Sequence, residues 1–386
     1  MQKLRRVSEL NVAGKRVLLR VDLNAEISRR KVQVSERFKA HAKTIAMLKR
    51  KRARIVVLAH QSRPGKSDFT NLKQHAKLLN RFTKIDYVPD VIGKLAVERI
   101  LSLKDGEAVL LENVRSLDEE FKPSTKNALV KVLGNLCELY VNDAFSILHR
   151  TQTTIIIFPK VMPSAIGPTL EAELRALSKI KNSSSLYILG GAKPDDLIPI
   201  IRSPTAKEVL AAGYLGQLAL IARGHNLGAQ NLFLKRWLGL TKKLKPMLGK
   251  LVLPVDYAIR VKGRRVEIPL EDFPSKYEIF DIGTHTQKIF AERIARSRRV
   301  LMKGTVGYCE EKEFCKGTKA LLRALSNSKA YSVLGGGHTL TALQKLRIPK
   351  SKFGYVSLSG GALIKFLAGE KLPGLVALEN SPIRHA

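Results

Sequence analysis

The sequence predicts an α/β protein of two domains, each built on a parallel sheet, joined by a connecting helix. Short runs rich in valine, isoleucine and leucine alternate with amphipathic segments along most of the chain. Continuous apolar runs are typical of parallel strands that are buried on both faces, and the segments between them have the pattern of crossover helices. A proline-rich break near the middle of the chain separates the two halves.

The first half is expected to contain four main strands, and the second half seven. The segment 37–51 (RFKAHAKTIAMLKRK) has the helical pattern that should follow the first strand, and 317–328 (GTKALLRALSNS) is a second clear example. The expected strands are 16–22, 55–60, 108–114 and 139–143, and then 185–191, 208–213, 251–259, 278–283, 299–304, 330–336 and 353–361.

Three prolines in 158–170 (FPKVMPSAIGPTL) mark the boundary, and 171–181 (EAELRALSKIK) is the expected connecting helix. We therefore predict an N-terminal domain over 1–163 and a C-terminal domain over 164–368 that includes this helix. The segment 369–386 is expected to be a tail that packs back toward the N-terminal domain.

Composition excludes several classes of protein. The 386 residues are 45% hydrophobic, which is enough for globular cores and excludes wholesale disorder. No uncharged apolar run reaches about 18 residues, and the first residues lack the apolar core of a secretory signal. Three cysteines are too few for a disulfide framework, so we expect a cytoplasmic protein without membrane association. Cys309 and Cys315 are expected to be ordinary buried or helical residues.

The net charge of +35 is unevenly distributed. Residues 1–100 carry +17, 101–200 carry −1, 201–300 carry +11 and 301–386 carry +8. Such an excess attracts polyanions or phosphorylated small molecules, and by itself it says nothing about the fold.

Polar and charged residues follow each expected strand of the first half, at the edge where parallel α/β sheets bind ligands. Arginine recognises phosphate and carboxylate through forked hydrogen bonds, so this set favours a small, highly anionic ligand over unrelated surface charges. The residues are Asp22, Asn24, His60, Arg63, Arg115, His149 and Arg150, with Arg37 opening the helix after the first strand.

Glycine-rich turns follow three expected strands of the second half: 189–193 (LGGAK), 334–339 (LGGGHT) and 358–362 (LSGGA). Glycine lets backbone N–H groups approach phosphate oxygens, and a helix N-terminus adds partial positive charge. The GxxxxGK[ST] motif is absent, which excludes a P-loop NTPase. Three such turns predict a nucleotide-phosphate site with Lys193 as a charge partner. Together the two halves predict phosphoryl transfer across a cleft.

The motifs RVDLN, AHQSRPG, LLENVR, VNDAF, GGAK, LPVD, DIG, GGGHT and LPG occur in the order found in phosphoglycerate kinases. From about residue 3 to residue 378 the chain resembles this family, and AHQSRPG and GGGHT resemble its archaeal branch. The resemblance implies two Rossmann-like domains with parallel sheets, joined by a connecting helix and hinge. It also implies reversible phosphoryl transfer between 1,3-bisphosphoglycerate and ADP, giving 3-phosphoglycerate and ATP, with Mg²⁺ as cofactor.

The resemblance also implies roles for individual residues. Arg37 would stabilise the transferring phosphoryl group, with Lys193 on the nucleotide side. His338 stands where many members carry Asp, and it either faces the metal-nucleotide or caps the turn. The implied substrate ligands are Asp22, Asn24, Arg37, His60, Arg63, Arg115 and Arg150. The implied nucleotide ligands are Lys193, Gly213 near the adenine, Glu310 near the ribose, Gly336, Gly337, His338, Thr339, Gly360 and Gly361.

Most departures from the family pattern fall in the nucleotide half. The usual NGPxGxFE reads KGTVGYCE, and Lys303 in its first position would add a charge to the phosphates. Leu197 stands where a second lysine often follows GGAK. The other changed positions are Thr305, Cys309, Leu358 and Ser359, with Ser116, Ile147 and Leu148 in the first half.

An alternative hypothesis starts from the charge that the site does not use. Basic clusters lie at 49–54, 235–250, 262–265 and 296–303, although one tryptophan in the second cluster is poor support for base stacking. No recognisable RNA-binding motif is present. The alternative is a kinase-derived protein with weak or no catalysis that binds RNA or the ribosome through its basic surface.

Overall fold

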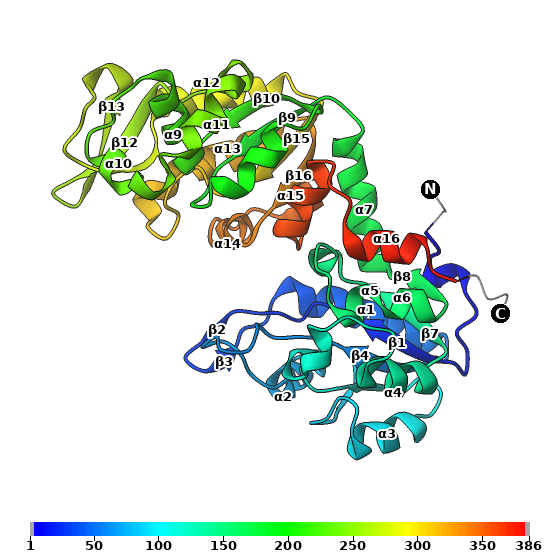
Figure 1. The fold of residues 1–386 in the computed structure, drawn as a ribbon. Coiled ribbons are helices and arrows are strands. Elements are labelled where there is room, and N and C mark those ends of the chain that lie inside the picture. Colours follow the sequence, from blue (N-terminus) through cyan, green and yellow to red (C-terminus); the bar gives the residue numbers. More distant parts are fainter. Residues whose placement is uncertain (1–3, 383–386) are drawn as a thin grey trace. The chain divides into compact units, whose positions relative to one another are not determined.

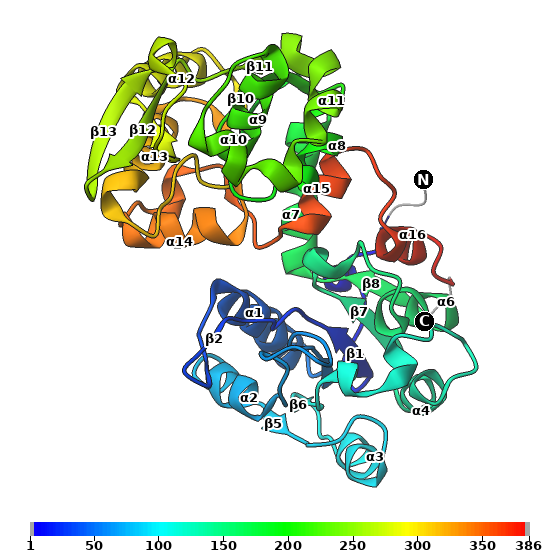
Figure 2. The same ribbon diagram turned by 60° about the vertical axis from the view of Figure 1, so that its left-hand side comes forward.

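The computed structural model describes residues 4–382, and the chain divides into two compact units. The first contains the residues up to Leu174 together with those from Lys371 onward, and the second spans Arg175–Glu370. The chain leaves the first unit within helix α7 (Pro168–Lys181) and returns to it after α15 (Gly361–Leu367), as Figures 1 and 2 show. Each unit has a six-stranded parallel sheet with helices around it, which confirms the predicted fold class.

The first sheet has the strand order β5-β6-β4-β1-β7-β8. Two short strands, β5 and β8, were not predicted, and β8 lies inside the proline-rich break. The strands are β1 (Arg16–Arg20), β4 (Arg54–Leu58), β5 (Asp86–Tyr87), β6 (Ala108–Leu110), β7 (Leu139–Asn142) and β8 (Ser164–Ile166), with a hairpin of β2 (Ile27–Ser28) and β3 (Lys31–Val32). The helices are α1 (Glu36–Arg50), α2 (Lys73–Leu79), α3 (Lys94–Leu101), α4 (Ala128–Leu136), α5 (Thr153–Ile156), α6 (Phe158–Val161) and α16 (Pro373–Glu379).

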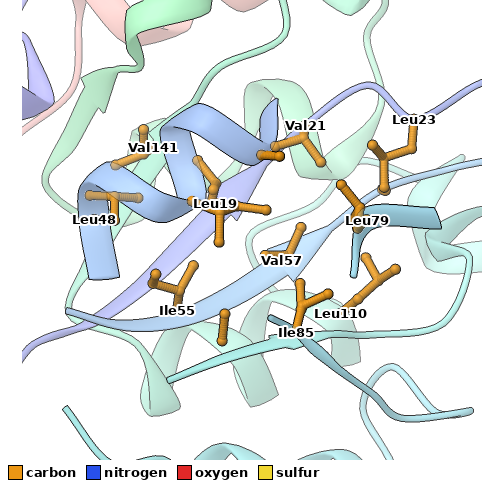
Figure 3. Close-up of a cluster of buried hydrophobic side chains, with 14 of the residues drawn as sticks. Leu19, Val21, Leu23, Leu48, Ile55, Val57, Leu79, Ile85, Leu110 and Val141 are labelled. Atoms are coloured by element: carbon orange, nitrogen blue, oxygen red, sulfur yellow. The ribbon is translucent and has the colours of Figure 1, made fainter. Parts of the chain in front are cut away.

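The core of the first unit forms between one face of this sheet and the helices α1 and α2 (Figure 3). Leu19 of β1 pairs with Val57 of β4 in the sheet, and both belong to one core cluster with Leu48 of α1; all three side chains are fully buried. Burying one such side chain stabilises the fold by about 1.5–3 kcal/mol. These contacts fix the strands whose ends carry the site residues.

Helix α16 packs against α5, α6 and β8. Gly374 permits this close approach, because a Cβ there would stand 2.7 Å from the Cγ2 of Ile155. The glycine of the LPG motif therefore has a packing reason.

The second sheet has the strand order β11-β10-β9-β15-β16-β17. Its strands are β9 (Ser185–Leu189), β10 (Ala206–Ala211), β11 (Leu251–Val252), β15 (Arg299–Lys303), β16 (Tyr331–Gly335) and β17 (Tyr355–Val356). The helices of this unit are α8 (Ile198–Ile201), α9 (Gly213–Arg223), α10 (Ala229–Phe233), α11 (Leu240–Leu244), α12 (Thr284–Ala295), α13 (Lys316–Asn327), α14 (Gly337–Lys345) and α15.

A small antiparallel sheet of order β13-β12-β14 also belongs to this unit, and it was not predicted. The expected strand 251–259 is two strands, because Pro254 has no backbone N–H to continue the ladder. Its second part lies in the antiparallel sheet, as does the expected strand 278–283. The three strands are β12 (Asp256–Val261), β13 (Arg264–Pro269) and β14 (Ile279–Ile282). In the described part of the chain, no helix is both long and apolar enough to cross a membrane.

Candidate functional site

In each unit, the loops that carry the predicted site residues lie at the edge where the parallel strands end. Strand β1 lies between β4 and β7, and the chain winds outward from it in both directions. Ligands of doubly wound sheets bind at such a switch point. The loops after β1, β4, β6 and β7 therefore bring their residues to one edge of the first unit.

Asp22 and Arg37 form the first pair at this edge. Arg37 Nη1 lies 3.4 Å from Asp22 Oδ2 and donates to the backbone oxygen of Asn24 at 2.6 Å. Burial alone would raise the pKa of Asp22. Arg37, His60 and hydrogen bonds from Ser146 and Asn24 outweigh that effect and lower the pKa well below its usual value. Asp22 is therefore an anion at neutral pH that holds Arg37 in place.

His60 lies at the same edge as a buried, neutral donor. Burial lowers its pKa well below 6.5, and the nearby Arg20 lowers it further. Arg20 Nη2 lies 3.2 Å from His60 Nδ1, and because a guanidinium can only donate, Nδ1 accepts. The ring proton of the neutral imidazole is therefore on Nε2, where it can serve an anionic ligand.

Arg115, which is buried, and Arg150, which is half-buried, each have a buried Nε atom without a partner in the described chain. Arg115 donates to the backbone oxygen of Ser62 and to Gln152 Oε1, the latter at 3.0 Å. Burial lowers the pKa of both arginines, and each arginine lies close to another cation. Within residues 4–382 the buried Nε atoms of Arg115 and Arg150 have no hydrogen-bond partner. Buried charged donors left unpaired are costly, so this arrangement favours an anion as the missing partner.

The remaining predicted residues lie around this group. Asn24 Oδ1 accepts from the backbone N–H of Ser62 at 2.7 Å, which joins the loops after β1 and β4. Arg63 is exposed on the second of these loops and lies close enough to Arg150 to lower its pKa.

Sequence reasoning missed the buried support beneath the arginines. Arg20 and Glu120 are both 0% exposed, with Arg20 Nη2 4.0 Å from Glu120 Oε1. Thr154 joins them: its hydroxyl accepts from Arg20 Nε at 3.0 Å and donates to Glu120 Oε1 at 2.7 Å. The one available signal was a charged residue inside the apolar run RVLLRVD.

In the second unit, the switch point lies between β9 and β15. A side chain on Gly190 would clash with the backbone oxygen of Thr305, and one on Gly304 would clash with that of Gly190. Gly213 has φ +52°, and a Cβ there would stand 2.7 Å from Gly191 N. Glycine is therefore required where these loops touch, which brings the predicted adenine-side residue Gly213 beside the GGAK loop.

The second glycine-rich turn, 334–339, leads into α14. Gly336 has φ +97°, and the space where a Cβ would point has no atom within 3.8 Å. Thr339 is fully buried, and its hydroxyl accepts from Gly304 N at 3.1 Å and donates to Gly335 O at 3.0 Å. Thr339 thus ties this loop to the end of β15. Its side chain supports the loop, whereas its predicted contact with nucleotide stays a prediction.

The other predicted nucleotide ligands are accessible. Gly337 is exposed and Gly360 is half-buried, and at both positions nothing lies within 4 Å of an added Cβ. Glu310 is exposed and accepts from the hydroxyl of Tyr308 at 2.9 Å. Lys193, His338 and Gly361 are exposed as well.

The expectation for Cys309 and Cys315 is wrong. They form a disulfide that closes a loop with a sequence separation of six, and this loop contains Glu310. The chain turns back between the two cysteines, which brings their sulfur atoms together.

The Ser359 substitution is accommodated without strain. Six non-glycine residues among those described have positive φ, and Ser359 is not one of them. It is 3% exposed, and its backbone N–H donates to Ser357 Oγ at 3.0 Å. An ordinary L-residue therefore fits this turn.

Two doubly wound parallel sheets, one edged by arginines and the other by glycine-rich turns, are the architecture of an α/β kinase. The family model described as phosphoglycerate kinase matches residues 7–370. The chain belongs to the phosphoglycerate kinase family.

Relatives and solved structures match nearly end to end. The phosphoglycerate kinase of Methanothermus fervidus is 37% identical, over 99% of this chain and 98% of that protein. That of Sulfurisphaera tokodaii is 38% identical, over 97% and 95%. The crystal structure of phosphoglycerate kinase from Pyrococcus horikoshii OT3 has a TM-score of 0.91 at 35% identity, covering 97% of this chain and 98% of that one. Its Coxiella burnetii counterpart has a TM-score of 0.82 at 28% identity.

Proposed function

We propose that this chain catalyses reversible phosphoryl transfer between 1,3-bisphosphoglycerate and ADP, giving 3-phosphoglycerate and ATP. Membership of the kinase family supports the reaction class. The observation that carries the proposal is the pair of buried arginine Nε atoms without partners, on Arg115 and Arg150, beside Arg37 and neutral His60. A ligand with both carboxylate and phosphate groups would satisfy these donors.

In the proposed reaction, the first unit binds the glycerate ligand. Arg115, Arg150 and Arg63 bind its anionic groups, while Asn24 and His60 donate hydrogen bonds. Asp22 is an acceptor for a hydroxyl group, and its charge also positions Arg37. These assignments use the types of donor and acceptor that each side chain offers.

The second unit binds the nucleotide along its glycine-rich edge. Gly336, Gly337 and Gly360 carry no side chain that would block an approaching ligand, and their backbone N–H groups would donate to phosphate oxygens. Thr339 keeps its loop in place, and the exposed residues His338 and Gly361 lie in the first turns of α14 and α15. Gly213 would lie by the adenine and Glu310 by the ribose.

Mg²⁺ would accompany the nucleotide. Among the residues described, no three His, Cys, Asp or Glu side chains cluster in a way that could hold a metal ion. Mg²⁺ usually keeps several waters and binds through one or two carboxylates plus substrate phosphates. A nucleotide-borne ion fits this edge, where Asp196 offers a carboxylate close enough to Lys303 to raise its pKa. When bound, Mg²⁺ supplies charge neutralisation of the phosphates.

The chemical step needs positioning and charge stabilisation. A terminal phosphate oxygen of ADP attacks the phosphorus of the acyl phosphate, and the bond to the carboxyl oxygen breaks, leaving the carboxylate of 3-phosphoglycerate. Charge on the equatorial oxygens is stabilised by Arg37 from the glycerate side and Lys193 from the nucleotide side.

The test is ATP formation from ADP and 1,3-bisphosphoglycerate by purified, nuclease-treated protein. We expect turnover, with Arg37→Ala lowering kcat by at least about 100-fold because one transition-state donor is lost. Lys39→Ala is the matched control, since Lys39 is an exposed cation on the same helix. Absence of turnover, or equal rates in Arg37→Ala and parent, would contradict the proposal.

Two finer expectations stay proposals. One is a cytoplasmic location, as expected for a protein acting on glycolytic intermediates. The other is RNA or ribosome binding through the basic surface. The RNA-binding proposal predicts that the affinity of the protein for structured RNA, measured by filter binding, falls steeply as the salt concentration rises toward the physiological value.

A further inference from the structure

Helix α1 contacts Asp22 through both the side chain and the backbone of that residue. Arg37, in the first turn of the helix, lies with its Nη1 3.4 Å from Asp22 Oδ2. One turn further along, His41 Nε2 accepts from the backbone N–H of Asp22 at 3.3 Å. Residues four apart lie on the same face of an α-helix. One face of α1 therefore fixes Asp22 at two points.

The ring of His41 is held by both of its nitrogen atoms. Because Nε2 accepts a hydrogen bond from a backbone N–H, the ring proton is on Nδ1. Nδ1 donates to Asp143 Oδ2 at 2.9 Å, and the two side chains are 2% and 0% exposed. A buried ring with a partner at each nitrogen has a single orientation, which Asp143 sets.

Asp143 in turn joins α1 to the beginning of α7. Its Oδ2 also accepts from the hydroxyl of Thr44, which lies on α1, at 2.7 Å. Its Oδ1 accepts from the backbone N–H of Thr169 at 2.7 Å and from that of Leu170 at 3.4 Å. The first N–H groups of a helix have no acceptor within the helix, so Asp143 caps α7. Gly167 permits this approach, because a Cβ there would clash with Asp143 Oδ1.

These contacts form one continuous chain of hydrogen bonds and ion pairs that ends at Arg37. The first turn of α7 fixes the carboxylate of Asp143, which sets the tautomer of His41. His41 then holds the backbone of Asp22, and the carboxylate of Asp22 lies against the Arg37 guanidinium. A displacement of about 1 Å at a reacting group can lower a rate by about 100-fold. The position of Arg37 thus depends on side chains that lie behind the ligand edge.

We propose that His41 and Asp143 are positioning residues for phosphoryl transfer: they fix the backbone of Asp22 and, through its carboxylate, the guanidinium of Arg37. This inference rests on the proposed function, in which Arg37 stabilises the transferring phosphoryl group. Both side chains are buried, and the polar atoms of His41 are already engaged, so they act through Asp22 rather than on substrate.

The first experiment measures kcat for ATP formation in a double-mutant cycle of His41→Phe and Arg37→Ala. Phenylalanine keeps an aromatic ring at position 41 and removes both hydrogen bonds. We expect His41→Phe to lower kcat by about 10-fold or more in the parent chain, because Arg37 can then leave its productive orientation. In the Arg37→Ala chain the same substitution should lower kcat by less than about 3-fold, because the group through which His41 acts is absent.

Asp143→Asn tests the same link with almost no change in side-chain shape. The amide oxygen would face the N–H groups of α7, so the amide nitrogen would donate to His41 Nδ1. The ring proton then moves to Nε2, where it faces the N–H of Asp22, and two donors repel each other. We expect kcat to fall by about 10-fold or more. Nitrogen-15 NMR should show the ring proton on Nδ1 in the parent and on Nε2 in the variant.

Two further variants complete the design. His41→Gln keeps one donor and one acceptor and should recover most of the kcat that His41→Phe loses. Lys43→Phe is the matched control, because it places the same residue at an exposed site on the same helix, and it should keep kcat within about twofold. If His41→Phe does not fold, Asp143→Asn is carried through the same cycle with Arg37→Ala.

The outcomes separate this inference from the proposed function. Turnover in the parent with an unchanged kcat in Asp143→Asn and His41→Phe overturns the inference and leaves the proposed function intact. An equal fold-loss of kcat in the parent and Arg37→Ala chains also overturns it, because the effect is then generally structural. A parent chain without turnover contradicts the proposed function, and this inference with it.

Discussion

Replacing Arg20 tests whether the buried Arg20–Glu120 pair supports the site residues at the strand ends of the first unit. Replacing it with methionine would leave Glu120 buried without its cation and His60 Nδ1 without its donor. At the observed 4.0 Å, two unit charges attract by about 4 kcal/mol for an effective dielectric constant of ~20. Removing one partner of a buried pair typically costs about 3–5 kcal/mol, and we expect Arg20→Met to destabilise the first unit by that amount.

Urea unfolding followed by circular dichroism measures this cost. With an m-value of about 2 kcal/mol/M, the midpoint of the first unit should fall by about 2 M. Trp237, the only tryptophan, lies in the second unit and reports that unit separately by fluorescence. Adding Glu120→Gln to Arg20→Met should recover at least about 2 kcal/mol, because the orphaned charge is removed. A loss below about 1 kcal/mol, or no recovery in the double variant, would refute the reasoning.

Three further predictions follow from the same contacts. NMR should show that the His60 imidazole is neutral at pH 6.5 and above, because the pKa of His60 is lower in the folded protein than in the unfolded chain. The neutral ring therefore contributes fully to the free energy of unfolding at pH 6.5 and above, and this contribution is lost as the pH falls. A His60 titration midpoint at pH 6.5 or higher would contradict this. Arg115→Lys should raise the KM for 3-phosphoglycerate by about 10-fold or more with a small effect on the KM for ADP, since a lysine cannot reproduce the guanidinium fork; equal effects on both substrates would argue against the assignment. Cys309→Ser should lower the free energy of unfolding by about 2 kcal/mol under oxidising conditions and should leave it unchanged in excess reductant, as expected for a disulfide closing a short loop. A loss of stability that persists in reductant would show that packing, rather than the disulfide, is responsible.

Strand ends were the part of the molecule that the sequence predicted best. Apolar runs such as the one around Leu19 identify buried parallel strands, and the polar residue after each run then lies at the ligand edge. This logic placed Asp22 and His60 correctly at one edge. It failed for Arg265 and its neighbours in β13, an antiparallel strand in which no residue is fully buried and which therefore has no continuous apolar run.

The buried residues that support the site could not be predicted from the sequence. Glu120 follows no strand and belongs to no motif, and its role exists only because folding brings it to Arg20. The same holds for the disulfide: Cys309 and Cys315 are six residues apart, but only the turn between them brings the sulfur atoms together. Such contacts depend on tertiary structure, which local patterns do not specify.

The two hypotheses for this chain make opposite demands on Lys303. A protein that had exchanged catalysis for binding through its outer surface would need cations that are exposed and well solvated. Lys303 instead is partly buried, lies beside Lys193 and faces the glycine loops, where an unpaired ammonium lowers the stability of the ligand-free fold. A bound phosphate chain would pair with the Lys303 ammonium and offset this loss of stability. The departure from the family pattern at Lys303 therefore favours an altered nucleotide site over an abandoned one.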